Sequence, residues 1–385
     1  MKYIIIILMM IAIVAKSQKL EQIQSIVNKS KDSVFYKEQA ELWKIETEKS
    51  PKNVNAWFNY YRAVKYGNYT RNINSNESLN KIMDKMKAQI PNSFEYNYLM
   101  YYNGGNNIKY ADYLLKAYKI EPKNTIAYPS LVTYCDIVGN KKLQNEVLIR
   151  WYNSNTYPTW KMYQAYNSLV GLDNNAIIFS NGDNNVYAKQ LLQTNKRVRT
   201  DVRVILMSLL YIDNYYKKTL KEFKIPVKFE DFNQFAKQNP KIGGQELMNL
   251  LLAKRVEYIA QSIKNASVYI DNSGIEQVEE YLKDKLYLEG IVFKFSEKEY
   301  DNITKMQLNF EQNYLFDYIK FNYQELDKYS SQKHATGNYI TFLSELYDFY
   351  KLSDDINNKI KVEKLLKIIA NNVGMENEIS ELINE

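Results

Sequence analysis

The sequence is poor in the residues that most catalytic and metal sites need. Its 385 residues include one cysteine, Cys135, and one histidine, His334. A zinc site built from several Cys and His ligands is therefore excluded by count, and no internal disulfide can form. A Ser-His-Asp or Cys-His site would have to use His334, which lies in the loop-like stretch SSQKHATGN, and we do not expect it to be catalytic. We expect Cys135 to be a small buried residue.

Familiar nucleotide and hydrolase motifs are also absent. There is no GxGxxG, no GxSxG, and no Lys-Ser or Lys-Thr pair after Gly243-Gly244. The net charge is +7, but basic and acidic residues are interspersed, without the basic stripe that nucleic-acid binding requires. Lys196, Arg197 and Arg199 form a local basic patch that would suit a phosphate or anionic glycan, or is simply solvated. We expect no nucleic-acid partner, no cofactor and no metal.

Long apolar runs are missing, except for one at the N-terminus. Tyr3 to Val14 is apolar, follows Lys2 and precedes Ala15-Lys16-Ser17. This is typical of a signal peptide and shorter than the roughly 20 residues that span a bilayer. We predict cleavage after Ser17 and a periplasmic or secreted, soluble mature chain without a transmembrane segment. An uncleaved anchor or a buried helix is the alternative.

Residues 18–170 show the apolar spacing of helices, with proline and glycine between the segments. Three junctions, beginning at Pro51, Pro91 and Pro122, share a proline, an asparagine within two residues and then an aromatic residue. We predict that the proline ends one helix and the asparagine caps the next. The junctions lie 40 and 31 residues apart, on either side of the roughly 34-residue tetratricopeptide period.

This region therefore resembles divergent tetratricopeptide repeats. Ala117 and Gly139 stand where such repeats place small residues, because their paired helices pack closely. The alternative is a helical bundle without repeats. Stacked repeats form concave surfaces that bind peptides and other extended ligands.

Aromatic residues of the helical region are candidates for lining such a groove. The chain contains 35 tyrosines, and a large ring with a polar tip suits a groove or a helix seam equally well. For most of these residues we favour the interhelical core. The candidates are Trp57, Tyr60, Tyr61 and Tyr98, followed by Tyr101 and Tyr102.

The pattern changes near residue 171, where short apolar runs begin to alternate with helical segments. Alternation of this kind favours a small, mostly parallel sheet with crossover helices. The predicted strands are Ala176–Ser180, Val202–Leu210, Ser267–Ile270 and Gly290–Phe295. The predicted helices are Val186–Asn195, Ile212–Phe223, Gly244–Lys264 and Ile275–Leu286.

Three stretches of this region, AIIFSNGDNN, VRTDVRVILMSLL and YLKDKLYLEGIVFKF, resemble the soluble part of Bacteroidota membrane proteins similar to protein O-mannosyltransferases, a family of unknown function. The likeness covers about residues 170–300. It implies an extracytoplasmic domain that works near glycan transfer or the envelope. The resemblance does not imply catalytic activity, because the membrane-embedded transferase part of those proteins is absent from this sequence. Where a second acid is expected after Gly182-Asp183, the sequence has Asn184-Asn185.

The turn after the first strand holds the leading ligand-binding candidates. Asn181, Asp183 and Asn184 offer oxygen ligands for a cation or for sugar hydroxyls. Asn-Gly-Asp-Asn also favours a turn, in which Asp183 or Asn184 simply caps the following helix, and we favour capping. Arg203 is a further candidate, either paired with Asp201 or facing a crevice. If the strands are parallel, Asp183 and Asp201 lie at opposite edges of the sheet.

The C-terminal region again has the pattern of helices. Tyr339–Tyr350 and Ile360–Asn371 predict an antiparallel pair with Gly374 near the end of the second helix. The predicted class is α+α/β, with tetratricopeptide-like helical repeats, a small mostly parallel α/β domain and a C-terminal helical cap. The predicted parts are a signal peptide at 1–17, a helical domain at 18–170, an α/β domain at 171–300 and a helical region at 301–385.

These observations favour a non-catalytic binding or scaffold protein of the periplasm or envelope. Its partner would be a peptide, a protein or a glycan. The alternative is an envelope enzyme that acts on glycans through acids of the α/β domain. The sequence contains 44 acidic residues and singles out no catalytic pair among them, so the catalytic residues of such an enzyme stay unassigned.

Overall fold

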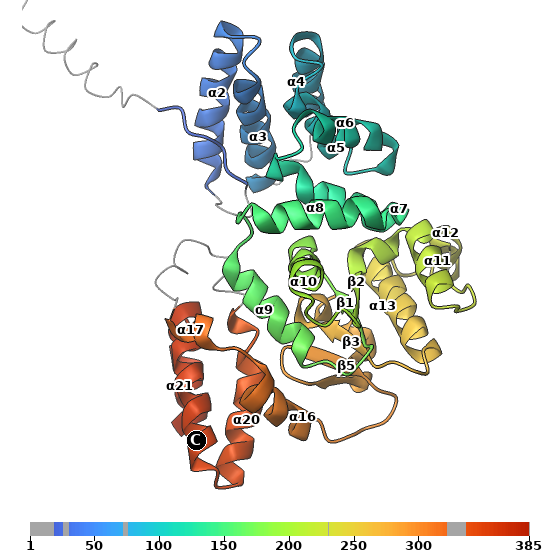
Figure 1. The fold of residues 1–385 in the computed structure, drawn as a ribbon, viewed down its shortest axis with the longest axis vertical. Coiled ribbons are helices and arrows are strands. Elements are labelled where there is room, and N and C mark those ends of the chain that lie inside the picture. Colours follow the sequence, from blue (N-terminus) through green and yellow to red (C-terminus); the bar gives the residue numbers. More distant parts are fainter. Residues whose placement is uncertain (1–18, 26–30, 72–75, 230, 322–335, 385) are drawn as a thin grey trace, which may run out of the picture. The chain divides into compact units, whose positions relative to one another are not determined.

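The computed structural model describes residues 19–25, 31–71, 76–229, 231–321 and 336–384 (Figure 1). The chain divides into two compact units, residues 1–130 and residues 131–385. The predicted signal peptide and His334 lie outside the described residues. None of the described helices combines the length and the apolar composition needed to cross a membrane.

The first unit is helical, as predicted. Helix α2 packs against α3, and α5 packs against α6. The elements of this unit are α2 (Ser33–Lys49), α3 (Val54–Thr70), α4 (Asn76–Gln89), α5 (Phe94–Asn103), η1 (Ile108–Tyr110), α6 (Ala111–Ile120) and η2 (Thr125–Ala127). Helix α7 (Tyr128–Val138) crosses the boundary between the units.

The proline junctions begin helices, and two of the three use the predicted cap. The side chain of Asn53 caps α3, and that of Asn124 caps η2. At the remaining junction, which begins at Pro91, the cap of α5 is Ser93, so the prediction of an asparagine cap is wrong there. The hydroxyl oxygen of Ser93 accepts a hydrogen bond from the backbone N–H of Tyr96.

The aromatic groove candidates lie mainly in the core of this unit. Trp57, Tyr61 and Tyr98 are buried, and Tyr60 is half-buried. The Tyr98 ring stacks on the Phe94 ring at 5.8 Å. These side chains therefore fill the space between the helices, which is the second of the two roles predicted for them.

The second unit contains a five-stranded sheet in the order β2-β1-β3-β5-β4. Strand β1 pairs in parallel with β2 and β3, whereas β5 pairs antiparallel with β3 and β4. The sheet is therefore mixed, with a parallel half and an antiparallel hairpin. The strands are β1 (Ile177–Ser180), β2 (Arg203–Leu206), β3 (Val268–Asp271), β4 (Leu286–Leu288) and β5 (Val292–Phe295).

Helices pack around this sheet and share one apolar core with it. Figure 1 shows α9, α10 and α13 around the strands. The elements are α8 (Lys141–Asn153), α9 (Thr159–Val170), α10 (Asp183–Lys196), η3 (Met207–Tyr211), α11 (Asp213–Glu222), α12 (Phe232–Gln238), α13 (Gly244–Ser262), α14 (Asn272–Ile275), α15 (Glu279–Leu282) and η4 (Lys283–Lys285). Helices α8 and α9 pack on α10, and the division into compact units falls at residue 130.

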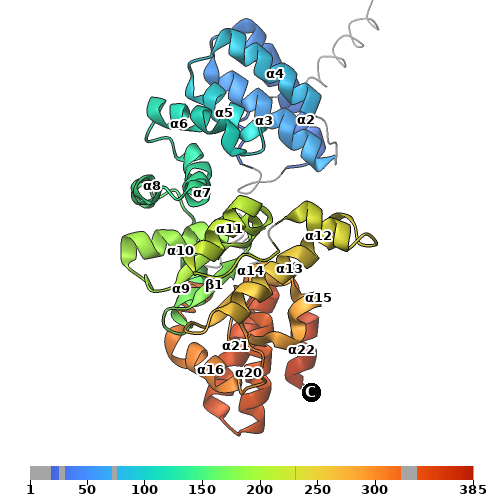
Figure 2. The same cartoon turned by 90° about the vertical axis from the view of Figure 1, so that its right-hand side faces the viewer.

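A second, tyrosine-rich core holds the C-terminal helices. Figure 2 shows α20 and α21 side by side, as predicted for this region. Helix α21 ends at Gly374, whose φ of 77° is left-handed, so the predicted helix end is confirmed. The elements are α16 (Ile303–Leu308), the π-helical turn η5 (Asn309–Asn313), α17 (Asp317–Phe321), α20 (Ile340–Leu352), α21 (Ile356–Val373) and α22 (Glu376–Asn384).

Candidate functional site

The turn after β1 begins a helix without a side-chain cap. Gly182 is the N-cap of α10, with φ 76°, and Asp183 is already the first helical residue. The expectation that Asp183 or Asn184 caps this helix is therefore wrong, because the left-handed backbone that glycine allows places the start of the helix one residue earlier. Asp183 lies in the first turn beside the Tyr187 hydroxyl, and burial raises the pKa of its carboxyl.

The crevice between the carboxyl ends of β1 and β3 is closed by an internal ion pair. In open α/β sheets ligands bind where the strand order reverses, which here is between these two strands. Lys189 of α10 pairs with Asp271, and both side chains are almost completely buried. Asp271 also accepts from the Ser180 hydroxyl at 3.1 Å and from the Ser273 N–H at 3.0 Å. The adjoining cavity of about 10 Å³ has room for about one water molecule.

Arg203 does not join the candidates at this turn. It begins β2, at the opposite edge of the sheet, and pairs with Glu222 at 2.9 Å. Asp201 pairs instead with Arg199 at 2.8 Å, so the suggested Asp201–Arg203 pair is wrong. The parallel pairing of β1 with β2 confirms that Asp183 and Asp201 lie at opposite edges.

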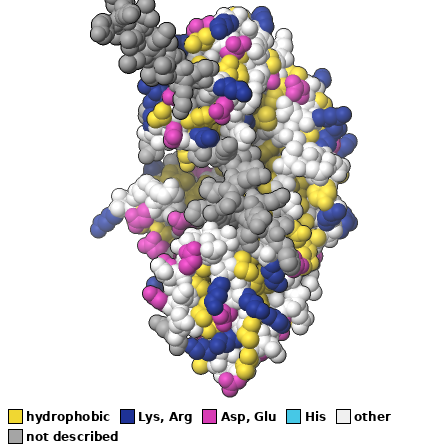
Figure 3. Space-filling model, turned by 90° about the vertical axis from the view of Figure 1, so that its left-hand side faces the viewer, with side chains coloured by type: hydrophobic (Ala, Val, Ile, Leu, Met, Phe, Trp, Pro, Cys, Tyr) yellow, Lys and Arg dark blue, Asp and Glu magenta, His cyan; other side chains and the backbone are white. Residues whose placement is uncertain are grey.

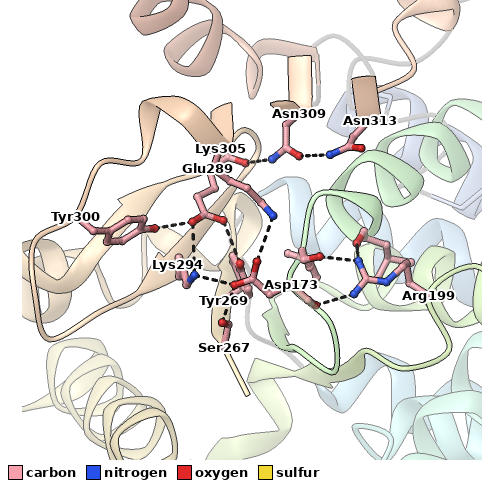
Figure 4. A network of polar contacts seen from close by, with 12 residues as sticks. Asp173, Arg199, Ser267, Tyr269, Glu289, Lys294, Tyr300, Lys305, Asn309 and Asn313 are labelled. Atoms are coloured by element: carbon pink, nitrogen blue, oxygen red, sulfur yellow. Dashed lines mark hydrogen bonds and ion pairs between the residues drawn. The ribbon is translucent and has the colours of Figure 1, made fainter. Parts of the chain in front are cut away.

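Arg199 has a structural role rather than the anion-binding role suggested by its basic neighbours. Its guanidinium donates to the carbonyl oxygens of Leu169 at 3.0 Å, Leu172 at 2.7 Å and Asp173 at 2.6 Å. These carbonyls lie at the end of α9 and in the loop before β1, as Figure 4 shows. Arg199 therefore fixes the backbone on which Asp173 stands.

An open pocket of about 510 Å³ lies beside Asp173, and we call it the carboxylate pocket. Its lining is rich in charged, hydroxyl and amide groups. The lining residues are Asp173, Glu289, Lys294, Tyr300, Asp301, Thr304, Lys305, Gln307, Leu308, Glu311 and Gln312.

Two carboxylates share one lysine at the centre of this pocket (Figure 4). The Nζ atom of Lys294 lies 2.7 Å from an oxygen of Asp173 and 3.9 Å from an oxygen of Glu289. Asp173 also accepts from the Ser267 hydroxyl at 2.7 Å and from Lys305 at 3.2 Å. The two acids therefore face the same cation from opposite segments of the chain.

Glu289 is buried and held by tyrosines. Its side chain is 2% exposed. It accepts from the hydroxyl of Tyr269 at 3.0 Å and from that of Tyr300 at 2.6 Å. Burial and the neighbouring Glu289 raise the pKa of both tyrosine hydroxyls, which therefore stay protonated donors.

The charge state of Asp173 follows from its partners. Partial burial opposes its ionisation, but Lys294, Ser267 and Lys305 together hold the pKa of its carboxyl well below the usual range. Asp173 is therefore an acceptor at neutral pH and not an acid that can release a proton.

The antiparallel half of the sheet positions these groups. Lys294 pairs in register with Tyr269 on one side and with Tyr287 on the other, so the three side chains share a face. The Tyr287 ring contacts the Tyr300 ring, with centroids 4.9 Å apart. Glu289 comes from the β4–β5 turn, immediately before Gly290.

Sequence reasoning did not find this site, although two of its residues lie in a stretch that it singled out. Glu289 and Lys294 belong to YLKDKLYLEGIVFKF, and Asp173 stands four residues before β1. The feature of the sequence that could have indicated this site is Lys294, a charged residue within an otherwise apolar strand. In the part of the chain that the structure describes, no group of three or more His, Cys, Asp or Glu residues is placed to hold a metal ion.

The fold and site define an α/β unit with a mixed five-stranded sheet, a closed crevice at the end of its parallel half and an open carboxylate pocket on its antiparallel half. Residues 161–316 match the family model described as TMEM260-associated domain 2. This segment contains all of the described residues that line the carboxylate pocket. The match is consistent with the O-mannosyltransferase-like resemblance noted over residues 170–300. No curated protein matches the chain.

Proposed function

We propose that this chain is an exported, non-catalytic binding protein of the cell envelope, and that its carboxylate pocket recognises a glycan. The observation that carries the proposal is the composition of that pocket of about 510 Å³, whose lining includes Asp173, Glu289, Lys294 and Tyr300. Export rests on the apolar N-terminal run, and the envelope rests on the resemblance to the soluble parts of O-mannosyltransferase-like proteins.

The chemistry of the pocket suits a sugar. Each sugar hydroxyl both donates and accepts, so a sugar site needs donors and acceptors close together. Carboxylates and glutamine carbonyls accept here, while lysines, Thr304 and the glutamine amides donate. The ring of Tyr300 adds an apolar surface to these polar groups. On the face in Figure 3 basic, acidic and hydrophobic side chains are interspersed.

Two features argue for binding without catalysis. A glycosidase needs one carboxyl group that is protonated at working pH, usually because its pKa is raised. Asp173 has its pKa lowered by its cations instead. Glu289 is 2% exposed and accepts from the hydroxyls of Tyr269 and Tyr300, so both of its carboxylate oxygens already have partners within the protein.

The alternative is an envelope enzyme that acts on glycans. One observation favours it, namely that two carboxylates converge on Lys294. A paired-carboxylate mechanism would use these two acids, with Lys294 or Tyr300 as the group that tunes their protonation. This alternative predicts turnover, which the binding proposal does not.

The test is a binding and turnover assay with the mature chain. Mannose, glucose, N-acetylglucosamine and short oligosaccharides are titrated while ligand-observed NMR records both binding and cleavage. We expect saturable binding of at least one sugar without cleavage, and at least tenfold weaker binding by Glu289→Gln. Glu222→Gln, which alters an ion pair outside the pocket, is the matched control. Absence of binding to all probes, or cleavage that Glu289→Gln abolishes, would contradict the proposal.

A further inference from the structure

A second pocket lies between α12 and α13 and is lined by aromatic rings. Its volume is about 300 Å³, and we call it the aromatic pocket. It shares no lining residue with the carboxylate pocket. Its lining is Lys228, Phe229, Phe235, Asn239, Leu250, Lys254, Glu257, Tyr258 and Gln261.

One wall of this pocket is held in an unfavourable backbone conformation. Phe229 has a φ of 56°, in the left-handed region that a bulky residue rarely adopts. Arg255 of α13, whose side chain is 0% exposed, donates to the Phe229 carbonyl oxygen at 2.9 Å. The same guanidinium donates to Leu210 at 2.5 Å and to Asp213 at 2.6 Å. A completely buried arginine thus fixes this strained residue, and strain of this kind gathers at binding sites.

The other walls are fixed as well. The Tyr258 hydroxyl donates to the Pro226 carbonyl oxygen at 3.0 Å. The Phe229 ring meets the Tyr258 ring at 6.0 Å and the buried Phe235 ring at 6.4 Å, and both pairs are edge-to-face. The aromatic walls are therefore in place before a ligand arrives, which lowers the entropic cost of binding.

The mouth of the pocket carries a cation, Lys228, against which no carboxylate of the described residues lies. The Lys228 ammonium lies 5.1 Å from the Phe229 ring centroid and 5.4 Å from that of Tyr258. Glu257, the acid among the described lining residues, is already paired with Lys254 at 3.1 Å and with Lys285 at 2.8 Å. Among the described residues that line the pocket, two lysines thus face one acid, so the mouth favours an anion.

We propose that the aromatic pocket binds a carboxylate attached to an aromatic or bulky apolar body. The body lies against the rings of Phe229, Phe235 and Tyr258, and the carboxylate meets Lys228 at the mouth. This chemistry occurs in a peptide that ends in an aromatic residue and in a free aromatic acid. A cationic ligand would instead have to displace Lys228 from the rings. The site is separate from the proposed glycan pocket and does not depend on it.

The test uses the mature chain and three probes that differ in one feature each. N-acetyl-phenylalanine carries the carboxylate, its amide lacks the carboxylate, and 3-phenylpropionate lacks the peptide group. Binding is followed by isothermal titration and by NMR of the aromatic side chains. We expect N-acetyl-phenylalanine to bind at least tenfold more tightly than its amide. Tighter binding of N-acetyl-phenylalanine than of 3-phenylpropionate assigns a peptide C-terminus, whereas equal binding assigns a free acid.

Variants separate the roles of charge and ring. Lys228→Met removes the exposed cation without changing the core. We expect this variant to bind N-acetyl-phenylalanine at least fivefold more weakly and to lose the preference for this acid over its amide. Tyr258→Leu removes one aromatic wall of the pocket, and it should weaken the binding of N-acetyl-phenylalanine and of its amide to the same extent. Lys221→Met, on the exposed surface of α11, is the matched control, and Glu289→Gln should leave this binding unchanged. Equal affinity of the wild-type chain for acid and amide, or no binding of the acid, would overturn the proposal.

Discussion

At the scale of single residues, partners decide the role of each charged side chain. Arg199, Arg203 and Asp183 all looked available in the sequence, and the structure gives the two arginines fixed partners. Glu289 and Asp173 looked unremarkable and converge on Lys294. A single sequence identifies charged residue types, but Asp173 pairs with Lys294, which lies 121 residues away in the chain, and a contact of that kind could not be predicted.

The lowered pKa of Asp173 predicts a pH-dependent contribution to stability. A group whose pKa is depressed in the folded state stabilises the fold above its unfolded pKa of about 3.9, and the contribution is lost as pH falls toward the folded value. We therefore expect Asp173→Asn to lower the free energy of unfolding by about 1–2 kcal/mol at pH 7 and by less at pH 3. Urea titrations at both pH values measure this difference. An equal loss at the two pH values would contradict the assigned ion pairs.

The Lys189–Asp271 pair predicts a large effect for removing one partner. Lys189→Met leaves Asp271 buried without its cation, and breaking a buried pair in this way costs about 3–5 kcal/mol. The double variant Lys189→Met with Asp271→Asn should recover part of the loss, because the remaining amide is uncharged. Thermal unfolding measures both, with Lys221→Met as control. A single variant as stable as the wild type would show that the crevice is not closed by this pair.

At the scale of elements, local patterns were enough for most helices and for four strands. They failed where an element is short or where pairing is distant. Strand β4 has three residues and lay at the end of a predicted helix, Ile275–Leu286. The antiparallel pairing of β5 with β3 was also missed, because the connection contains only short helical segments and a hairpin in place of a crossover helix.

The proline junctions of the first unit share a contact that the sequence pattern did not reveal. The side chain six residues after each proline donates to its carbonyl oxygen, through Trp57 at 2.8 Å, Asn97 at 3.2 Å and Tyr128 at 3.0 Å. Each contact fixes the chain at the start of a helix. The contact therefore gives the junction pattern a physical basis, without testing the predicted repeats.

This contact predicts a measurable cost for removing one donor. Trp57→Phe keeps an aromatic ring in the core but leaves the Pro51 carbonyl without its partner. We expect a loss of about 1–2 kcal/mol in the free energy of unfolding, since both hydrogen-bond and packing terms are reduced. Tyr69→Phe, at a side chain that is 72% exposed, should cost almost nothing. Denaturant unfolding compares the two, and equal losses would show that the junction contact is not stabilising.

The β4–β5 turn has a strict requirement for glycine. Gly290 has φ 110°, and an added Cβ would lie 2.2 Å from the Tyr314 hydroxyl oxygen. Gly290→Ala should therefore destabilise the protein by about 2 kcal/mol or more and displace the neighbouring Glu289. Gly243→Ala, where an added Cβ meets nothing within 4 Å, is the control. Unfolding together with sugar binding measures both effects, and a stable Gly290→Ala variant with unchanged binding would contradict this account of the turn.

At the scale of the whole molecule, the spacing of apolar residues predicted the class, and contacts set the division into units. The α+α/β class is confirmed, with helices before and after a small sheet. The boundary at residue 130 was not foreseen, because helical periodicity continues unchanged through α7, α8 and α9 and carries no sign of which core each helix joins. The carboxylate pocket was missed for a related reason, since it lies on the antiparallel half of the sheet rather than at the predicted turn.

The central claim is that the carboxylate pocket binds a sugar and does not transform it. The most direct measurement is calorimetric titration of the mature chain with the sugar selected by NMR, at pH 7, for the wild type, Glu289→Gln and Glu222→Gln. We predict one site per chain, at least tenfold weaker binding for Glu289→Gln, unchanged binding for Glu222→Gln and recovery of intact sugar afterwards. Equal affinity in all three proteins, or recovery of a cleaved product, would contradict it.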